Sequence, residues 1–462
     1  MRLASGGLND MHDRILVPIC WLLLACSNSL GDDWPSYLGA RRDSVWREDG
    51  ILESFPDSGP ALRWSAKIGG GYAGPAVAGG YVYVADWIAK PMDGPYENAN
   101  KGPIPQNQNF VRERRPGHER VLCFRESDGK LIWKHEYERD YTSAATYAIG
   151  PRCTPTVDGD LVYALGCEGD LKCLRTKDGS VVWEKYFVED YGLKVPEWGV
   201  AAAPLIDGDK LICMVGGPEA TCVAFDKRSG EEIWRTLDAR QPGYSAPVIY
   251  EFGGIRQLIV WDSDAVTALR PETGEVIWTI PFEATFAMTI GTPRREGNRL
   301  FVMCFNRMSA AIDVAADGLS ASIAWSGDAK NGISGVLNTA FLIDGHIYGC
   351  GNGGRYTCAR LSDGSHVWST FEPTSGSRPI PWGEAFTVRH QDRFFLANDL
   401  GDLILAKLSP QGYQEISRAH LIEPTHQVGR RTLVWSHPAF ANKSVYLRND
   451  KELRCYSMAA EQ

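Results

Sequence analysis

The sequence predicts an all-β protein, an eight-bladed β-propeller built from four-stranded antiparallel blades. The first observation is a repeated pattern, Gly-x-x-(Ile/Val)-Trp, whose five copies end at Trp133, Trp183, Trp234, Trp278 and Trp368. Successive tryptophans lie 50, 51, 44 and 90 residues apart, and a weaker copy ending at Trp325 divides the double interval. Self-similarity at about 40–50 residues is typical of propellers and other repeat architectures.

The second observation is that each repeat contains four short strand patterns. In the second repeat we expect strands at about residues 146–157, 161–166, 170–175 and 180–187. Apolar and polar residues alternate within them, and Asp-Gly turns separate them, which is the hairpin signature. Later repeats begin near Gly199, Gly243, Met288, Leu337, Gly383 and Leu433.

The third observation concerns the two ends of the repeat array. The seventh repeat has residues 412–417 in place of its tryptophan strand, and the eighth ends after three strands at Tyr456. A single tryptophan strand, ending at Trp64, precedes the first repeat. Because an open ring would leave a sheet edge unpaired, we expect this N-terminal strand to join the C-terminal blade and close the propeller. The tryptophans, Trp64 included, should lie on outermost strands and pack against the neighbouring blade.

The N-terminal residues 1–31 read as a signal peptide. Arg14 precedes the apolar stretch 15–26, which has the length of a signal core and is too short to span a bilayer. The end of this stretch resembles a bacterial lipobox, which makes Cys26 a lipidation candidate; the alternative is ordinary cleavage after Gly31. We therefore expect an exported protein that is periplasmic or envelope-associated, with membrane contact only through a lipidated Cys26.

The rest of the chain divides into an irregular leader, residues 32–60, and one propeller, residues 61–458, with an insertion at 88–118. The formal net charge of −9 and the lack of basic clusters predict no nucleic-acid partner. We expect a monomer. Cysteines alternate with alanine at one repeat position, so buried thiols are favoured, although a pair such as Cys213 with Cys222 stays open.

The unequal loops indicate where a binding site would lie. Turns between the first and second strands and between the third and fourth are tight, whereas the opposite face receives the insertion and the long connections between blades. Loops carry function on rigid scaffolds, so we predict a funnel on the long-loop face. The residues expected to line it are Tyr147, Arg152, Trp198, Tyr244, Trp382, Glu384, Trp435 and His437. The alternatives are that Trp198 and Trp382 only shape the entries to their blades, and that Arg152 fills the channel or is paired and does not hold a substrate.

No metal site and no catalytic residue is predicted. The histidines and cysteines show no zinc-ligand spacing, and the two G-x-G-x-x-G matches, at residues 69–74 and 349–354, do not open helices as a dinucleotide site requires.

The repeat ending at Trp278, residues 268–278, resembles the tryptophan repeats of the quinoprotein (PQQ-like) β-propellers, and the resemblance extends from residue 61 to 456. The leader, with Trp34-Pro35-Ser36-Tyr37-Leu38-Gly39, looks like that of exported bacterial members described as BamB-like or PQQ-binding-like. In the dehydrogenases of that family, pyrroloquinoline quinone and calcium lie beside a disulfide of adjacent cysteines. No two cysteines are adjacent here, and no calcium ligands can be matched.

Two functional hypotheses follow from the repeats and the resemblance. The first is an exported binding or scaffold propeller of the bacterial envelope, which engages a protein or glycan partner on its long-loop face. The second is a quinoprotein oxidoreductase that uses PQQ and calcium to oxidise an alcohol or a sugar. The sequence favours the first, because it offers no recognisable cofactor or catalytic set.

Overall fold

The computed structural model describes residues 32–107, 110–142, 144–147, 150–306, 308–328 and 331–460. The predicted signal peptide, residues 1–31, and its lipidation candidate Cys26 lie outside the described residues. Among the helices of the described part, none has the length and apolarity needed to cross a membrane.

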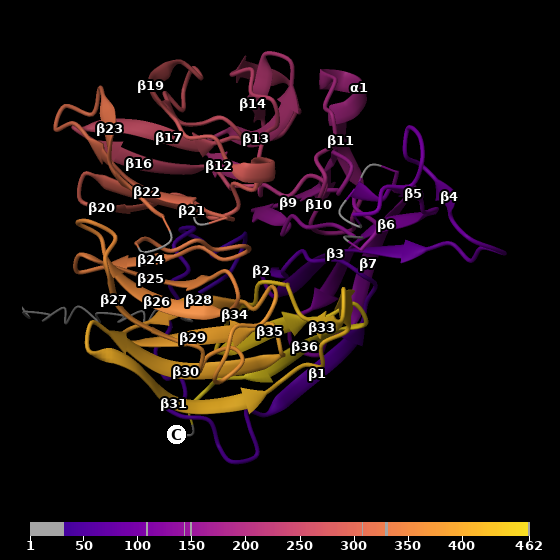
Figure 1. Ribbon diagram of the computed structural model, residues 1–462. Coiled ribbons are helices and arrows are strands. Elements are labelled where there is room, and N and C mark those ends of the chain that lie inside the picture. The colour runs from indigo at the N-terminus through magenta and orange to yellow at the C-terminus, as the bar shows by residue number, and fades with distance from the viewer. Residues whose placement is uncertain are drawn as a thin grey trace, which may run out of the picture. The chain divides into compact units, whose positions relative to one another are not determined.

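The prediction of an eight-bladed, all-β propeller is confirmed (Figure 1): eight four-stranded antiparallel sheets follow one another around a ring. The first blade contains β2 (Ala76–Ala78), β3 (Tyr81–Ala89), β6 (Gly117–Arg125) and β7 (Leu131–Glu138). The second contains β8 (Thr156–Asp158), β9 (Leu161–Leu165), β10 (Asp170–Arg175) and β11 (Val181–Tyr186). The third contains β12 (Leu205–Asp207), β13 (Lys210–Gly217), β14 (Ala220–Asp226) and β15 (Glu232–Thr236). The fourth contains β16 (Val248–Phe252), β17 (Ile255–Trp261), β18 (Ala265–Leu269) and β19 (Val276–Pro281).

The remaining blades repeat this arrangement. The fifth contains β20 (Arg294–Glu296), β21 (Arg299–Cys304), β22 (Met308–Val314) and β23 (Ala321–Ser326). The sixth contains β24 (Phe341–Ile343), β25 (His346–Gly351), β26 (Arg355–Arg360) and β27 (His366–Thr370). The seventh contains β28 (Ala385–His390), β29 (Arg393–Asn398), β30 (Asp402–Ser409) and β31 (Gly412–His420). The eighth contains β34 (Ala439–Ala441), β35 (Ser444–Arg448), β36 (Glu452–Ser457) and β1 (Leu62–Lys67).

A few elements lie outside the blades. Two short hairpins are formed by β4 (Glu97–Asn98) with β5 (Glu113–Arg114) and by β32 (His426–Val428) with β33 (Arg431–Leu433). The helix α1 (Phe187–Tyr191) and the 3₁₀ turn η2 (Thr285–Ala287) also lie between strands of the described chain. The first hairpin belongs to the insertion, and the second occupies the long connection between the seventh and eighth blades.

The innermost strands are shorter than the sequence patterns suggested. The strand expected at residues 146–157 is reduced to β8, which begins at Thr156. Proline supplies a physical reason, because it has no N–H to donate to a sheet ladder. In six blades a proline stands directly before the innermost strand: Pro75, Pro155, Pro204, Pro247, Pro293 and Pro438. The residues that precede these prolines therefore leave the sheets, and they are available to line the centre of the ring.

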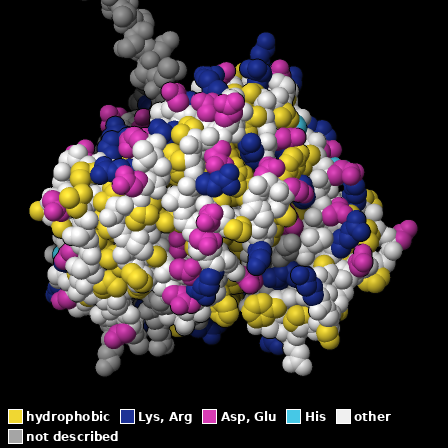
Figure 2. Space-filling view, turned by 90° about the horizontal axis from the view of Figure 1, so that it is seen from above, with side chains coloured by type: hydrophobic (Ala, Val, Ile, Leu, Met, Phe, Trp, Pro, Cys, Tyr) yellow, Lys and Arg dark blue, Asp and Glu magenta, His cyan; other side chains and the backbone are white. Residues whose placement is uncertain are grey.

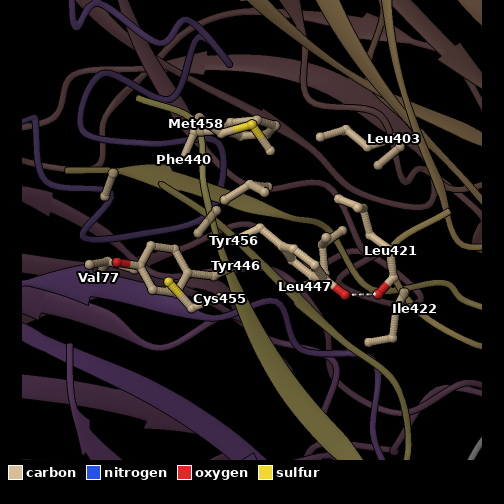
Figure 3. Close-up of a cluster of buried hydrophobic side chains, with 14 of the residues drawn as sticks. Val77, Leu403, Leu421, Ile422, Phe440, Tyr446, Leu447, Cys455, Tyr456 and Met458 are labelled. Atoms are coloured by element: carbon tan, nitrogen blue, oxygen red, sulfur yellow. Dashed lines mark hydrogen bonds between the residues drawn. The ribbon is translucent and has the colours of Figure 1, made fainter. Parts of the chain in front are cut away.

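Ring closure by the N-terminal strand is also confirmed. β1 pairs with β36, and Trp64 lies opposite Cys455. In Figure 1 the indigo β1 accordingly runs beside the yellow C-terminal blade. The core beneath this junction includes Val77 from the first blade together with Phe440 and Tyr446 from the eighth (Figure 3), and the Tyr456 hydroxyl donates to the Leu421 carbonyl. Residues from both ends of the chain thus share one hydrophobic cluster.

The Gly-x-x-(Ile/Val)-Trp repeat forms a contact between successive blades. The Trp234 ring covers Gly274 of the next blade, so that a Cβ added at Gly274 would lie 2.7 Å from Cε3 of the ring. The Trp234 indole N–H donates to the carbonyl of Pro271, three residues before that glycine, at 3.1 Å. The same pairing joins Trp64, Trp133, Trp183 and Trp325 to Gly129, Gly179, Gly230 and Gly364. Glycine and tryptophan recur together because in these five cases the tryptophan packs on the glycine of the following repeat.

The contact after the fourth blade departs from this arrangement. The indole N–H of Trp278 donates to Oε1 of Gln257 at 2.9 Å, within its own blade. The Gln257 amide in turn donates to the Gly318 carbonyl at 2.6 Å. One buried glutamine therefore links Trp278 to the fifth blade, whose copy of the repeat motif, ending at Trp325, is a weak one.

The leader crosses the centre of the ring. Trp34 pairs with Val77 of the first blade, and the Pro35 carbonyl accepts from Val157 of the second. The buried Arg42 guanidinium donates to the carbonyls of Ala203, Pro204 and Pro247, which precede the innermost strands of the third and fourth blades. The leader continues to the remaining blades through contacts with Arg294, Thr339, Arg389 and Phe440. The sequence predicted only an irregular segment here, whereas the structure shows a plug that contacts every blade.

The cysteines and the surface charges are distributed through the whole ring. Each of the ten described cysteines is buried with a free thiol, and Cys213 lies opposite Val223 in the β13–β14 ladder, not opposite Cys222. On the face drawn in Figure 2, basic and acidic side chains are interspersed. Surface ion pairs occur among the described residues, such as Arg240 with Asp264 at 2.6 Å.

Candidate functional site

A cavity of about 520 Å³ lies at the centre of the ring, at the end where the connections enter the innermost strands. We call it the central chamber. In seven blades, the residue four positions before the innermost strand lines it: Tyr72, Arg152, Ala201, Tyr244, Ile290, Leu337 and Trp435. The seventh blade contributes Trp382, three positions before β28. The propeller therefore places one side chain from each of its eight blades around a single space.

The leader forms the floor of the chamber. Tyr37 lines the cavity, and its ring contacts the His437 ring edge-on at a centroid separation of 4.9 Å. Burial raises the pKa of the Tyr37 hydroxyl, so the floor carries no charge from this residue near neutral pH. With Arg42 anchored to three blade carbonyls close by, the chamber is closed at the end where the leader crosses.

The mouth of the chamber is formed by segments that the repeats do not share. Gln106, Asn107 and Phe110 come from the insertion, and Val428 and Gly429 come from the β32–β33 hairpin. The Phe110 ring lies 6.3 Å from the ring of Phe286, which belongs to η2. The insertion thus reaches across the ring to the connection before the fifth blade.

Two aromatic residues of the chamber have left-handed backbone conformations. Trp382 has φ of 60° and Phe286 has φ of 57°, a region that bulky residues rarely occupy because Cβ approaches the backbone. The Trp382 ring lies 6.0 Å from the Phe305 ring, and both line the cavity. Strain of this kind persists where the surrounding structure imposes it, and it is concentrated at binding and catalytic sites.

The residues selected from the sequence are brought together with one exception. Tyr147, Arg152, Trp198, Tyr244, Trp382, Trp435 and His437 line the chamber. Glu384 lies behind the wall: its side chain is fully buried and accepts from the Asn338 amide at 2.6 Å. Burial raises the pKa of Glu384 to about 8.

Sequence reasoning missed Tyr37, Tyr72, Phe110, Phe286 and Phe305. Tyr72 could have been found from the repeat. It lies four residues before Ala76, the first residue of β2, just as Tyr244 lies four residues before Val248, the first residue of β16. The other four lie in the leader, the insertion and irregular connections, where no repeat relates one segment to another.

One side of the chamber is held by a chain of polar contacts. The Asp450 carboxylate accepts from Nδ1 of His426 at 3.0 Å, and Nε2 of His426 contacts the Tyr72 hydroxyl. The same hydroxyl donates to the Tyr147 carbonyl at 3.1 Å. The Arg152 guanidinium lies over the Tyr72 ring, 4.3 Å from its centroid. Elements from the first, second and eighth blades thereby fix the position of the guanidinium.

This polar side continues into the third and fourth blades. The Trp198 indole N–H donates to the Tyr147 hydroxyl at 2.6 Å, and the Trp198 and Tyr244 rings meet edge-on at 6.1 Å. The opposite side is apolar and is formed by Met288, Ile290, Phe305, Val336 and Leu337. The chamber therefore has a polar aromatic wall facing an apolar wall.

The described lining residues include no Asp and no Glu, and Arg152 is the only Lys or Arg among them. Burial lowers the pKa of His437 to about 4, so this imidazole is neutral near neutral pH. Calcium is held by several oxygen ligands, usually with carboxylates among them. The donor set of the chamber does not fit a calcium ion, and the described residues contain no group of three His, Cys, Asp or Glu side chains suited to a metal.

A second buried polar cluster lies between the first two blades. Burial raises the pKa of Glu119 to about 7, and its carboxyl group accepts from the hydroxyls of Tyr137 and Tyr141 and from the N–H of Cys167 at 2.9 Å. Asp170, which burial also gives a raised pKa, is paired with Arg139. These groups contact one another between β6, β7 and β10, so we interpret the cluster as an interblade contact.

Comparisons with known proteins agree with this architecture. A family model described as outer membrane protein assembly factor BamB matches residues 117–370, more than half of the chain. The fold is similar to that of BamB from Moraxella catarrhalis, with 16% identity and a TM-score of 0.51 over 74% of this chain and 90% of that one. It is also similar to quinohemoprotein alcohol dehydrogenase from Comamonas testosteroni, with 12% identity and a TM-score of 0.61 over 93% and 81% of the two chains.

A computationally designed protein, Ika8, shares the fold as well, with 10% identity and a TM-score of 0.53 over 86% of this chain and 99% of that one. At these identities the likeness shows the fold alone. No curated protein sequence matches the chain.

Proposed function

This chain belongs to the family of the outer membrane protein assembly factor BamB, and on that premise we propose that it is an exported binding protein of the bacterial envelope that holds a glycan in the central chamber. The observation that carries the proposal is the chamber itself, an aromatic-lined space of about 520 Å³ that opens on the long-loop face and is closed by the leader. Ligand sites are typically concave, mostly apolar and furnished with a few convergent polar groups.

The two unlike walls of the chamber suit a sugar. One face of a pyranose ring consists of C–H groups that pack on aromatic rings, and its edge carries hydroxyl groups that need hydrogen-bond partners. Trp382 and Phe305 offer the first kind of surface. Tyr147, Arg152 and Asn107 offer polar groups. The strained backbone of Trp382 supports the same reading, because it holds a large ring in the cavity at a conformational cost of about 1–2 kcal/mol.

A protein partner fits this recessed site less well. Stable protein–protein interfaces bury about 800 Å² on each partner, which calls for a broad surface, not an enclosed chamber. A quinoprotein oxidoreductase is also disfavoured, because the described part of the lining supplies no carboxylate to hold calcium or to act as a base. Both alternatives give distinct outcomes in the experiment that follows.

The experiment is a titration of the purified full chain with a panel of oligosaccharides. Tryptophan fluorescence reports on the binding, because Trp198, Trp382 and Trp435 line the chamber. We expect saturable changes with at least one glycan and a loss of about tenfold or more in affinity for Trp382→Ala, since truncating a buried aromatic anchor costs about 2 kcal/mol or more. Tyr81→Ala is the matched control: Tyr81 is an exposed aromatic residue at the start of β3, beside a tight turn.

Three outcomes would contradict the proposal. Equal affinity of wild type and Trp382→Ala would place the site elsewhere. Saturable binding of PQQ with Ca²⁺, together with dye-linked oxidation of an alcohol, would establish the oxidoreductase. Isolation of a stoichiometric envelope protein with no glycan binding would establish a protein partner.

A further inference from the structure

We infer that a polar cleft beside the central chamber is a second sugar-binding site, so that the ligand is an oligosaccharide of uncharged sugars that continues from the chamber across Phe286 into the cleft. The inference rests on the proposed function and adds the length and the charge of the glycan. It follows from the way in which the two spaces adjoin, from the exposure of Phe286 and from the polar groups of the cleft.

The first step concerns the place of the cleft. It has a volume of about 370 Å³, and like the chamber it falls within the range of ligand sites, about 300–1,000 Å³. Phe286 lines both spaces. Glu197 and Ala287 of the cleft are the sequence neighbours of Trp198 and Met288 of the chamber. The two spaces therefore share a wall, and Phe286 belongs to both of its sides.

The second step concerns the Phe286 ring. Phe286 is 52% exposed, although its φ of 57° and the φ of 54° at Ala287 place two successive residues in the left-handed region. This conformation costs free energy for a residue with a Cβ, and a ring that stays half exposed recovers only part of that cost by burial. The ring presents an apolar face between the two spaces, on which the C–H face of a sugar can pack.

The third step concerns the hydrogen-bonding groups of the cleft. The Arg240 guanidinium donates from Nε to Asp264 at 2.6 Å and from Nη2 to Glu283 at 2.7 Å. Glu197 accepts from the Gln241 amide at 3.4 Å through Oε2. Within the described part of the chain, Nη1 of Arg240 and Oε1 of Glu197 make no hydrogen bond. The first atom can donate to a sugar hydroxyl, and the second can accept from one.

The fourth step concerns charge. Arg240 is already balanced by its two acidic partners, Asp264 and Glu283. Glu197 interacts electrostatically with Arg112 of the insertion. Among these described groups, two guanidinium groups thus meet three carboxylates. An acidic sugar would find no excess of positive charge here, whereas hydroxyl groups can pair with both kinds of side chain.

The test measures the affinity of the purified full chain for two neutral series, cello-oligosaccharides and xylo-oligosaccharides, each of two to six sugar units. In wild type, a ligand one or two units longer than the shortest that binds should bind about tenfold more tightly or more, the range for a hydrogen bond to a charged group. Arg240→Gln and Phe286→Ala should each lower this ratio of affinities. Phe286→Tyr should retain it, because it keeps the aromatic face.

The matched control is Arg228→Gln, which should leave the ratio unchanged. Arg228 is also an exposed arginine in an ion pair, with Asp160 at 3.3 Å, but it lies in the tight turn between β14 and β15. The shortest ligand is an internal reference, because it occupies the chamber without reaching the cleft. Its binding, together with the melting temperature and near-UV circular dichroism, shows that each variant is folded.

A ratio close to one in wild type would overturn the inference and leave the proposed function standing, as would a ratio that stays unchanged in both Arg240→Gln and Phe286→Ala. Oligogalacturonates should show a smaller ratio than the neutral series, and an equal or larger one would overturn the assignment to uncharged sugars. Binding of no oligosaccharide at all by wild type would overturn both the inference and the proposed function.

Discussion

The pairing of Trp234 with Gly274 predicts that the two residues are energetically coupled across the boundary between the third and fourth blades. The perturbation is Gly274→Ala, made in wild type and again in Trp234→Ala. Gly274 has φ of +74°, and an added Cβ would lie 2.7 Å from the Trp234 ring. In wild type the methyl group therefore meets both an unfavourable backbone conformation and a ring that is fixed by its hydrogen bond to Pro271.

The two contributions can be estimated separately. A left-handed conformation costs an alanine about 1–2 kcal/mol, and overpacking a tight contact costs about 1–3 kcal/mol more. Gly274→Ala should thus destabilise wild type by about 2–5 kcal/mol. Trp234→Ala alone should cost about 3–5 kcal/mol, as expected for a tryptophan that is 8% exposed. In the Trp234→Ala background the ring is gone, so Gly274→Ala should cost only the backbone contribution, about 1–2 kcal/mol.

The assay is denaturant unfolding of the four proteins, followed by circular dichroism, with the coupling energy taken from the double-mutant cycle. Gly208→Ala is the control, because Gly208 has φ of +59° and nothing within 4 Å of the added methyl group. It should cost the same in both backgrounds. A Gly274→Ala cost that does not fall when Trp234 is removed would refute the reasoning, since the glycine would then be required for its backbone alone.

Three further predictions concern buried polar groups. The pKa of Glu384 is raised to about 8, against 4.5 for the free group, so the contribution of its protonated carboxyl group to stability is complete below pH 4.5 and is lost as the pH rises towards 8. The melting temperature of wild type should therefore fall across this pH range, and the melting temperature of Glu384→Gln should change less with pH. Arg42→Leu should lower the unfolding free energy by about 3 kcal/mol or more and speed proteolysis of the leader, because three buried carbonyls lose their donor; unchanged proteolysis would contradict the plug. Gln257→Leu should cost about 1–3 kcal/mol in denaturant unfolding by leaving the Trp278 N–H unsatisfied, whereas a neutral result would show that the bridge to the fifth blade is dispensable.

The parts of the fold that repeat could be predicted from the sequence. Hydrophobic alternation, Asp-Gly turns and the spaced tryptophans each recur in most blades, so an error in one copy is corrected by the others. The missing strand of the eighth blade and the single strand at Trp64 could be matched by counting, and β1 pairs with β36 as expected.

The parts that occur once could not be predicted in the same way. The path of Arg42 to the third and fourth blades depends on which carbonyls remain unpaired at the centre of the ring, and no sequence period records this. The reach of Phe110 to Phe286 depends on the three-dimensional course of a non-repeating insertion. The aromatic wall was largely found because it follows the repeat, whereas the floor and the mouth were missed because they do not.

The leader also has a consequence for the order in which the ring can assemble. Its contacts begin at Val77 and end at Ala459, which is paired with Ile51. The segment that enters the ring first in sequence therefore cannot complete its contacts until almost the whole chain is present. Contacts between residues so distant in sequence carry a large loop-closure entropy and slow folding. We expect blades to form early and locally, and the insertion of the leader together with the docking of β1 to be the last, rate-limiting event, which commits all eight blades to a single cooperative unit.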